Sequence, residues 1–351
     1  LVTMLKDNVA VIGLGLGGET VGLEFQKRNY PTYLINGSVQ DNKTLSGAKN
    51  LMILKGYDGL AGDRNLALNA LKQNKDIIIQ LGDIKKKIIL CIASGGGSTG
   101  SGTIPYICDL VIRPDNIVVP ILLMPRADEP IQKRLNAYNV AKEIMETDGI
   151  GAVIFVNNEA YQDLKKINEV LVNMLDAFFS DSSSSSGSNF DDSEKMKMLQ
   201  ESGAFVLAML SNKNADTGKV TSNDMVNALT AKNIFLPINN DGVVGNIGVI
   251  NQTGSNINEH EIVKAIGVPE NIFVGHNGSV NIACASGLGM PTEYISRLGK
   301  SAVEEQKERL NKRSTVTSFL DELDMTVEPV AEKKQITGKR KRVSFDELRN
   351  L

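Results

Sequence analysis

The sequence predicts an α/β fold, in which a parallel sheet with helices on both faces is joined by a long central helix to a smaller α+β domain. Through the first half of the chain, short apolar runs of strand type alternate with segments of helical spacing, as in strand–helix–strand units. From about residue 220 a short helical segment precedes closely spaced strand-like runs. The 351 residues are enough for two domains.

Five apolar runs predict the strands of the parallel sheet: residues 8–13, 31–35, 88–93, 117–124 and 151–156. Four segments have the spacing of helices: residues 20–27, 66–75, 133–146 and 159–179. In sheets of this kind, ligands bind at the carboxyl ends of the strands. Glycine- and asparagine-bearing turns follow the strands at those ends, so we expect the binding site there.

The second half of the chain is predicted to hold the connector and the smaller domain. Residues 190–210 have the pattern of another long helix, apolar in its second half. A helix at 224–232 and strands at 235–238, 242–250, 272–276 and 279–285 follow. The expected division is a first domain at 1–188, a central connecting helix at 189–212, the smaller domain at 213–290, a C-terminal helix at 291–320 and a flexible charged tail at 321–351.

Composition and spacing exclude several classes of protein. A formal net charge of −3 gives no global basic face for nucleic acid, and no apolar run is long enough to span a membrane. Cys91, Cys108 and Cys284 are widely spaced in apolar contexts, which predicts buried thiols in a reducing, cytoplasmic compartment. His260 and His276 do not combine with other side chains at metal-ligand spacing, and no nucleophile elbow of a hydrolase occurs.

The glycine-rich run at residues 94–103 is the most informative segment. It directly follows the strand at 88–93 and leads into a helix. Glycines let the backbone approach an anion closely, and the unpaired N–H groups and the dipole of a helix N-terminus favour negative charge. The hydroxyls of Ser98, Thr99, Ser101 and Thr103 add donors. We therefore interpret this run as a phosphate-binding loop.

A second glycine loop runs from Gly13 to Gly18 and fits the pattern G-x-G-x-x-G. A dinucleotide site would also need an acidic residue near the end of the second strand, where this chain has Asn36-Gly37-Ser38. A P-loop would need a lysine after its glycines, and neither glycine loop contains one. The two commonest kinds of site with such loops, the dinucleotide-binding site and the P-loop, are therefore disfavoured.

The two loops and the segments around them resemble the tubulin/FtsZ family of GTPases. The run at 96–102 resembles the signature G-G-G-T-G-[ST]-G, with Ser98 in place of a glycine, and residues 157–160 resemble the D-N-E-A segment. Further resemblances follow in the family's order: the first phosphate loop at 13–18, the G-A-G loop near the γ-phosphate at 59–63, the P-x-x-x-E loop at 125–129 and the start of the L-N-x-D catalytic loop at 220–224. They cover roughly residues 9–230. Within the family, the chain is most similar to the TubZ-type proteins of plasmids and phages.

The resemblance implies roles in GTP binding. The residues that would hold the phosphates are Gly15, Leu16, Gly17, Thr20, Ala61, Gly62, Asp63, Gly96, Gly97, Ser98, Thr99, Gly100, Ser101 and Gly102. Glu129 would reach the ribose and Asn158 would recognise guanine. Phe190 would stack on the base and Glu194 would accept from its N–H groups; the alternative is that Phe190 is a core residue and Glu194 solvated. Mg²⁺ would be held through the phosphates, because Ser38 stands where the family has an acidic residue.

The resemblance also implies that hydrolysis is completed at a subunit interface. Asp224 would enter the next subunit's nucleotide site and orient the attacking water. Asn227, where the family often has a second acid, would hydrogen-bond that water. The alternative is that Asp224 only caps its helix.

The implied function is a GTP-hydrolysing cytoskeletal protein of a bacterial host cell's cytoplasm, which polymerises head to tail. It would segregate plasmid or phage DNA through a DNA-binding, TubR-like adaptor at the C-terminal tail. The basic run from Lys339 to Arg342 would add weak, salt-sensitive DNA contact. Two alternatives stay open: an NAD-dependent oxidoreductase that uses the loop at 13–18, and a non-catalytic nucleotide-binding adaptor.

Overall fold

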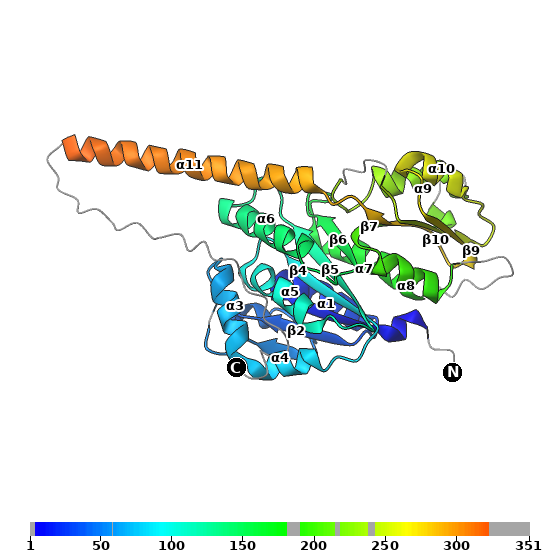
Figure 1. Cartoon of the computed structure of the whole chain (residues 1–351), viewed down its shortest axis with the longest axis horizontal. Helices are drawn as coiled ribbons and strands as arrows, with labels where there is room; N and C mark the ends of the chain where they lie inside the picture. The colour runs from blue at the N-terminus through cyan, green and yellow to red at the C-terminus, as the bar shows by residue number, and fades with distance from the viewer. Residues whose placement is uncertain (1–3, 58, 181–189, 215–217, 238–242, 323–351) are drawn as a thin grey trace.

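A computed structural model describes residues 4–57, 59–180, 190–214, 218–237 and 243–322. In these residues, ten strands form one sheet in the order β3-β2-β1-β4-β5-β6-β7-β10-β8-β9. Helices cover both faces of its first half, and a long C-terminal helix projects from the body (Figure 1). The predicted α/β class is confirmed.

The first six strands are parallel and form the half of the sheet that positions the glycine loops. They are β1 (Val9–Leu14), β2 (Thr32–Asn36), β3 (Leu51–Ile53), β4 (Ile88–Ser94), β5 (Ile117–Met124) and β6 (Ala152–Asn157). Five of them match the predicted runs. The edge strand β3 was not predicted, because three half-buried residues are too few to set a period.

The helices of this half divide between the two faces of the sheet. They are η1 (Leu5–Asn8), α1 (Gly15–Lys27), α2 (Val39–Asn42), α3 (Arg64–Gln73), α4 (Lys75–Gly82), α5 (Ser98–Val111), α6 (Ile131–Met145) and α7 (Leu164–Ser180). Val9 and Val11 of β1 pack in one core with α1 and α7, whereas Ala10 and Ile12 pack in the other with α3 to α6. This is the alternation expected of a strand buried on both faces.

The second half continues the same sheet. Its elements are α8 (Asp192–Gln200), β7 (Gly203–Leu210), η2 (Asn212–Asn214), α9 (Ser222–Thr230), β8 (Asn246–Gln252), α10 (Glu259–Ile266), β9 (Asn271–Gly278) and β10 (Asn281–Leu288). β7 is parallel to β6, and β10 is antiparallel to both β7 and β8. Because one sheet runs through both halves, the division into domains stays a prediction.

The predicted central helix at 189–212 is wrong. The structure has the short helix α8, a break at Gly203 with φ of 128°, and then the strand β7. The apolar run of β7 pairs with β6 on one side and with β10 on the other. Backbone hydrogen bonds to these two strands favour an extended conformation over a helix. The long helix that precedes the second half of the chain is α7 instead. The strand expected at 235–238 is only a single bridge between Phe235 and Val156.

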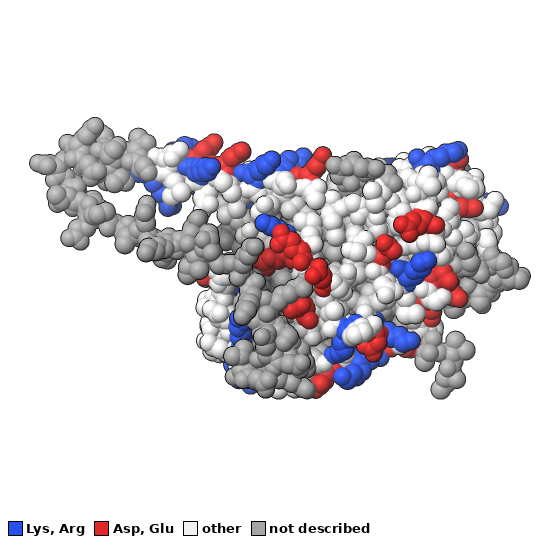
Figure 2. Space-filling view, in the orientation of Figure 1, with Lys and Arg blue, Asp and Glu red and all other residues white. Residues whose placement is uncertain are grey.

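The C-terminal helix is α11 (Thr292–Glu322), close to the predicted bounds. It packs along α6, where buried Arg134 donates to Ser301 Oγ at 3.3 Å and pairs with Glu305. Acidic and basic side chains alternate along its outer surface (Figure 2). The charged tail predicted beyond it and the serine-rich run at 181–189 lie outside the described residues. Among the helices that are described, none has the length and apolarity needed to cross a membrane.

Candidate functional site

Both glycine loops end at helix N-termini that lack a capping side chain. β1 passes directly into α1, whose N-cap is Leu14, and β4 reaches α5 through a tight turn with Gly97 as N-cap. Neither N-cap side chain bonds to the first turn. The first N–H groups of α1 and α5 are therefore left for another acceptor, and both helix dipoles favour an anion there.

The fold brings these two helix starts into contact. A methyl group on Gly15 would lie 3.1 Å from the backbone nitrogen of Gly100, and one on Gly100 would lie 2.7 Å from the carbonyl oxygen of Leu14. Gly15 also has a φ of 65°, which favours glycine. Only glycines let the two backbones meet this closely, so one site with two sets of N–H groups results.

The hydroxyls of the loops point mainly into the protein. Thr20 Oγ1 donates to the carbonyl of Gly17 at 2.8 Å, and Ser101 Oγ donates to the carbonyl of Gly97. Thr103 Oγ1 donates to the carbonyl of Thr99 at 2.7 Å. In this arrangement the backbone N–H groups, rather than these hydroxyls, are the donors offered to a ligand.

A buried carboxyl group lies beneath the two loops. Glu19 of α1 is fully buried, and its Oε2 accepts from Asn36 Nδ2 at 2.8 Å, while Asn36 Oδ1 faces Thr99 Oγ1 at 3.4 Å. Burial raises the pKa of Glu19 to about 7; the charge of Asp41 adds to this rise and the bond from Asn36 opposes it. Asn36 stands where a dinucleotide site would carry its ribose acid, which disfavours the oxidoreductase alternative.

The segment 61–63 completes a third loop beside the site. Ala61 and Gly62 both have positive φ, 45° and 81°. Asp63 is occupied as the N-cap of α3, because its Oδ1 accepts from the N–H groups of Asn65 and Leu66. The Asp63 carboxylate therefore fixes the start of α3 through Oδ1, and its predicted place beside the terminal phosphate stays a prediction.

Helix α6 supplies residues that the sequence analysis missed. Lys133 Cβ lies 3.0 Å from where a methyl group on Gly96 would be, and Lys133 Nζ pairs with Glu129 Oε2 at 2.8 Å. Asn136 bonds to the carbonyl oxygens of Gly62 and Gly96. The stem of Lys133 thus packs against the glycine loop, while its ammonium group is held by Glu129. The spacing of four between Glu129 and Lys133 signals their ion pair, but not the contact of Lys133 with the glycine loop.

Asn158 lies at the end of β6, beside the segment that carries Glu129. Its N–H donates to the carbonyl of Met124 at 3.3 Å, and Glu159 Oε1 accepts from the N–H of Ala127 at 2.8 Å. Asn158, at the end of β6, therefore lies beside the segment that follows β5 and carries Glu129; that the two residues serve one ligand stays a prediction. Three residues on, Tyr161 is 38% exposed and has Lys166 Nζ 4.7 Å from its ring.

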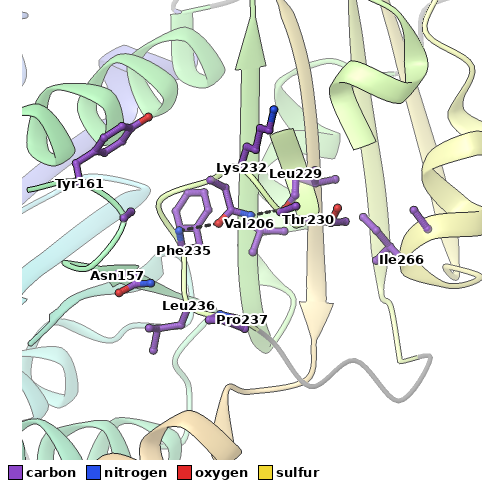
Figure 3. Close-up of a pocket in the computed structure, with 14 residues that line it drawn as sticks. Asn157, Tyr161, Val206, Leu229, Thr230, Lys232, Phe235, Leu236, Pro237 and Ile266 are labelled. Carbon is purple, nitrogen blue, oxygen red and sulfur yellow. Dashed lines mark hydrogen bonds between the residues drawn. The ribbon is translucent and has the colours of Figure 1, made fainter. Parts of the chain in front are cut away.

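A cavity of about 730 Å³ adjoins this strand end. Asn157 and Tyr161 line one side of it, and Lys232, Phe235 and Ile266 come from the second half of the chain (Figure 3). The glycine loops are not among the residues that line this cavity.

The comparisons with known proteins agree with this geometry. No family model matches the chain. It is 23% identical over 360 residues to the tubulin-like protein TubZ of Clostridium botulinum C phage, covering 98% of the chain and 96% of that protein. The structure of C. botulinum phage c-st TubZ with its tail truncated has a TM-score of 0.76, 20% identity, and covers 87% of this chain and 99% of that one.

This chain is tubulin/FtsZ-like. A GTPγS-form protofilament of TubZ from Bacillus thuringiensis serovar israelensis also matches, with a TM-score of 0.72, 16% identity, and coverage of 91% of this chain and 95% of that one. TubZ proteins are thus matched in both sequence and fold.

In this tubulin/FtsZ-like chain, Phe190 cannot stack on guanine as predicted, and the contact of Glu194 with guanine stays a prediction. Phe190 is fully buried, with its ring stacked on that of Phe273 at 6.0 Å and edge-to-face with that of Phe178 at 6.3 Å. Glu194 closes a capping box, since its Oε2 accepts from the N–H of Asp191 at 3.1 Å. The core-residue alternative holds for Phe190, and no ring face is left for a base.

Asp224 lies in the first turn of α9, away from the glycine loops of its own chain. Its Oδ2 accepts from the N–H of Thr221 at 2.9 Å and from Thr221 Oγ1 at 2.7 Å, and these bonds lower the pKa of Asp224. Thr221 is the N-cap, so Asp224 is the second member of a capping box. Asn227 is one turn further along the same helix.

A different carboxylate stands at the opposite end of β1 from the glycine loops. η1 precedes β1, and Asp192, the first residue of α8, lies near enough to the backbone N–H of Leu5 in η1 for that group to oppose the rise of its pKa. Burial and the charge of Asp191 raise the pKa of Asp192, against the effect of Lys195. Bonds from the Glu194 side chain and from Ser193 lower the pKa of Asp191 to about 2. Asp192 is therefore the better proton acceptor of this pair.

Proposed function

We propose that the protein is a GTPase that polymerises head to tail. The observation that carries the proposal is the meeting of two uncapped helix N-termini, α1 and α5, through Gly15 and Gly100 at the carboxyl ends of parallel strands. Such a site suits a chain of phosphates. The likeness to TubZ, including a GTPγS-form protofilament, supports guanine nucleotide and filaments. A contact repeated head to tail without closure makes a filament.

Guanine specificity would come from the end of β6. The Asn158 amide can both donate to and accept from the base, and the exposed ring of Tyr161 can stack on it in place of buried Phe190. Glu129 would bond the ribose. Binding of GTP but not ATP, measured by titration calorimetry, tests this part, and equal affinity for the two would contradict it.

Mg²⁺ would be carried by the phosphates. Ser38 accepts from the N–H of Asp41 and Asp63 caps α3, so these polar side chains of the site already have partners. Mg²⁺ commonly keeps waters and takes ligands from substrate phosphates. We therefore assign no protein ligand to it; the ion would supply charge neutralisation, while the N–H groups of α1 and α5 position the phosphates.

The neighbouring subunit would supply the catalytic carboxylate. In a head-to-tail contact along β1, the end that carries η1 and α8 meets the next subunit's glycine loops. Asp192 lies at that end, near the backbone N–H of Leu5, whereas Asp224 lies on α9, which packs on β7 and β10. We propose Asp192 as the residue that orients the attacking water, with Asp224 and Asn227 as the alternative.

Two matched variants, Asp192→Ala and Asp224→Ala, separate these assignments. Both remove a carboxylate from the first turn of a short helix. The proposal expects Asp192→Ala to bind GTP and form filaments with turnover reduced about 100-fold or more, and Asp224→Ala to turn GTP over near the wild-type rate. The reverse pattern assigns the role to Asp224, and wild-type turnover in both variants refutes an interface carboxylate on either helix.

We also propose, from the likeness to TubZ, that the filament segregates plasmid or phage DNA in the cytoplasm of a bacterial host. A DNA-binding adaptor of the TubR kind would bind the tail at 321–351, whose basic run could touch DNA weakly. A variant that ends at residue 322 should keep GTP turnover while a plasmid that depends on it is lost. Stable inheritance with that variant would contradict a role for the tail.

A further inference from the structure

The side chain of Asn136 joins two of the three loops around the proposed phosphate site. Asn136 lies on α6 and is 2% exposed. Its Nδ2 donates to the carbonyl oxygen of Gly62 at 3.0 Å and to that of Gly96 at 3.3 Å. Its Oδ1 accepts from Gln132 Nε2 at 2.9 Å. Both N–H bonds of one buried amide are thus committed to carbonyls of two different loops.

The loop at 61–63 depends on such an anchor. Ala61 adopts a left-handed conformation, which is strained for a residue with a side chain. A methyl group on Gly59 would meet nothing within 4 Å, and one on Gly62 would meet only Gln132 Cγ. The packing around these glycines is therefore open, and the bonds to fixed neighbours must hold the loop.

Two neighbours hold it at different points. Arg64, just after the loop, donates from Nη2 to the carbonyl of Ser101 at 2.7 Å and pairs with Glu143 of α6 at 2.8 Å. Asn136 holds Gly62 inside the loop itself. Arg64 therefore ties the start of α3 to α5, whereas Asn136 sets the distance between the 61–63 loop and the glycine run at 96–102.

We propose that Asn136 is a positioning residue that lets the protein distinguish GTP from GDP. The inference rests on the proposed function, in which the 96–102 run holds the inner phosphates and the 61–63 loop meets the terminal one. Asn136 fixes the spacing between these two loops. Without its amide the 61–63 loop relaxes from its strained conformation, whereas the 96–102 run is still held between β4 and α5, so GTP binding falls more than GDP binding.

The test is the ratio of the affinities for GTPγS and GDP, measured by calorimetry at protein concentrations below assembly. Asn136→Ala should lower this ratio about tenfold, as expected for the loss of two buried hydrogen bonds. The matched control is Asn74→Ala. Asn74 is 3% exposed and likewise bonds two carbonyl oxygens, those of Lys55 and Ala70, but neither belongs to the phosphate loops. The control should lose stability and keep the wild-type ratio.

A second variant protects the test against failure to fold. Gln132 is exposed, and Gln132→Ala removes the donor that orients the Asn136 amide together with the Cγ beside Gly62, while both bonds from Asn136 Nδ2 stay, so a smaller fall in the same ratio is expected. The inference is overturned if Asn136→Ala and Asn74→Ala change the ratio equally. It is also overturned if Asn136→Ala does not fold and Gln132→Ala folds but keeps the wild-type ratio. A wild-type protein that binds neither nucleotide overturns the proposed function, and this inference with it.

Discussion

The buried carboxyl of Glu19 makes the stability of the protein depend on pH in an unusual direction. Its pKa rises from 4.5 to about 7 on folding because the group is buried. Between these values the native protein holds a proton that the unfolded chain has released, so stability falls as the pH rises through this window and levels off above it. At 1.36 kcal/mol per pKa unit, the shift is worth about 3 kcal/mol.

The perturbation that isolates this effect is Glu19→Gln. Glutamine keeps an acceptor for the 2.8 Å bond from Asn36 Nδ2 and has no proton to lose. The variant should match the wild type at about pH 4.5 and exceed its free energy of unfolding by about 3 kcal/mol at about pH 8. A Glu24→Gln variant on the same helix keeps Glu19 and so should keep the wild-type slope.

Urea unfolding of the nucleotide-free protein, followed by circular dichroism because the chain has no tryptophan, gives the free energies. Equal pH dependence in the wild type and Glu19→Gln would refute the reasoning, since the slope would then come from other groups. A difference that appears at low pH and vanishes at high pH would refute its sign.

Two further predictions concern the loops and the base. Gly100→Ala should cost about 1–3 kcal/mol of stability, because its methyl group would lie 2.7 Å from the Leu14 carbonyl oxygen. Gly97→Ala is the control, because its methyl group would meet only the Ser94 carbonyl oxygen, at 3.8 Å. Equal thermal midpoints of the two variants would contradict the packing argument. Tyr161→Ala should weaken GTP binding about tenfold through lost stacking, while Phe190→Leu lowers stability and leaves the affinity unchanged; titration calorimetry distinguishes them, and the opposite pattern would return the stacking role to Phe190.

The parts of the fold that local sequence determines were predicted. The strand at 88–93, the glycines after it and the helix that follows are adjacent in the chain, and their order alone identifies an anion site. The loop from Gly13 and the polar end of β6 at Asn158 were found for the same reason. Each of them is a strand end whose residue types carry the signal.

The parts of the fold and the site that depend on contacts between residues distant in the sequence were not predicted. The apolar run at 203–210 suits a buried helix as well as a buried strand, and its pairing with β10, more than 70 residues on, decides between them. Phe190 is aromatic near acidic residues in sequence, but Phe178 and Phe273 enclose it. Asn136 and Lys133 reach the glycine loop only because α6 packs on it, and no spacing in the sequence shows that contact.

The central claim is that the nucleotide site is completed by a second subunit. The most direct measurement is GTP turnover per subunit against protein concentration, with light scattering recorded in the same samples. The account predicts turnover near zero at low concentration and a steep rise where scattering begins, because only assembled subunits bring α8 of one to the glycine loops of the next. A rate per subunit that stays constant across the whole range, with or without scattering, would contradict it.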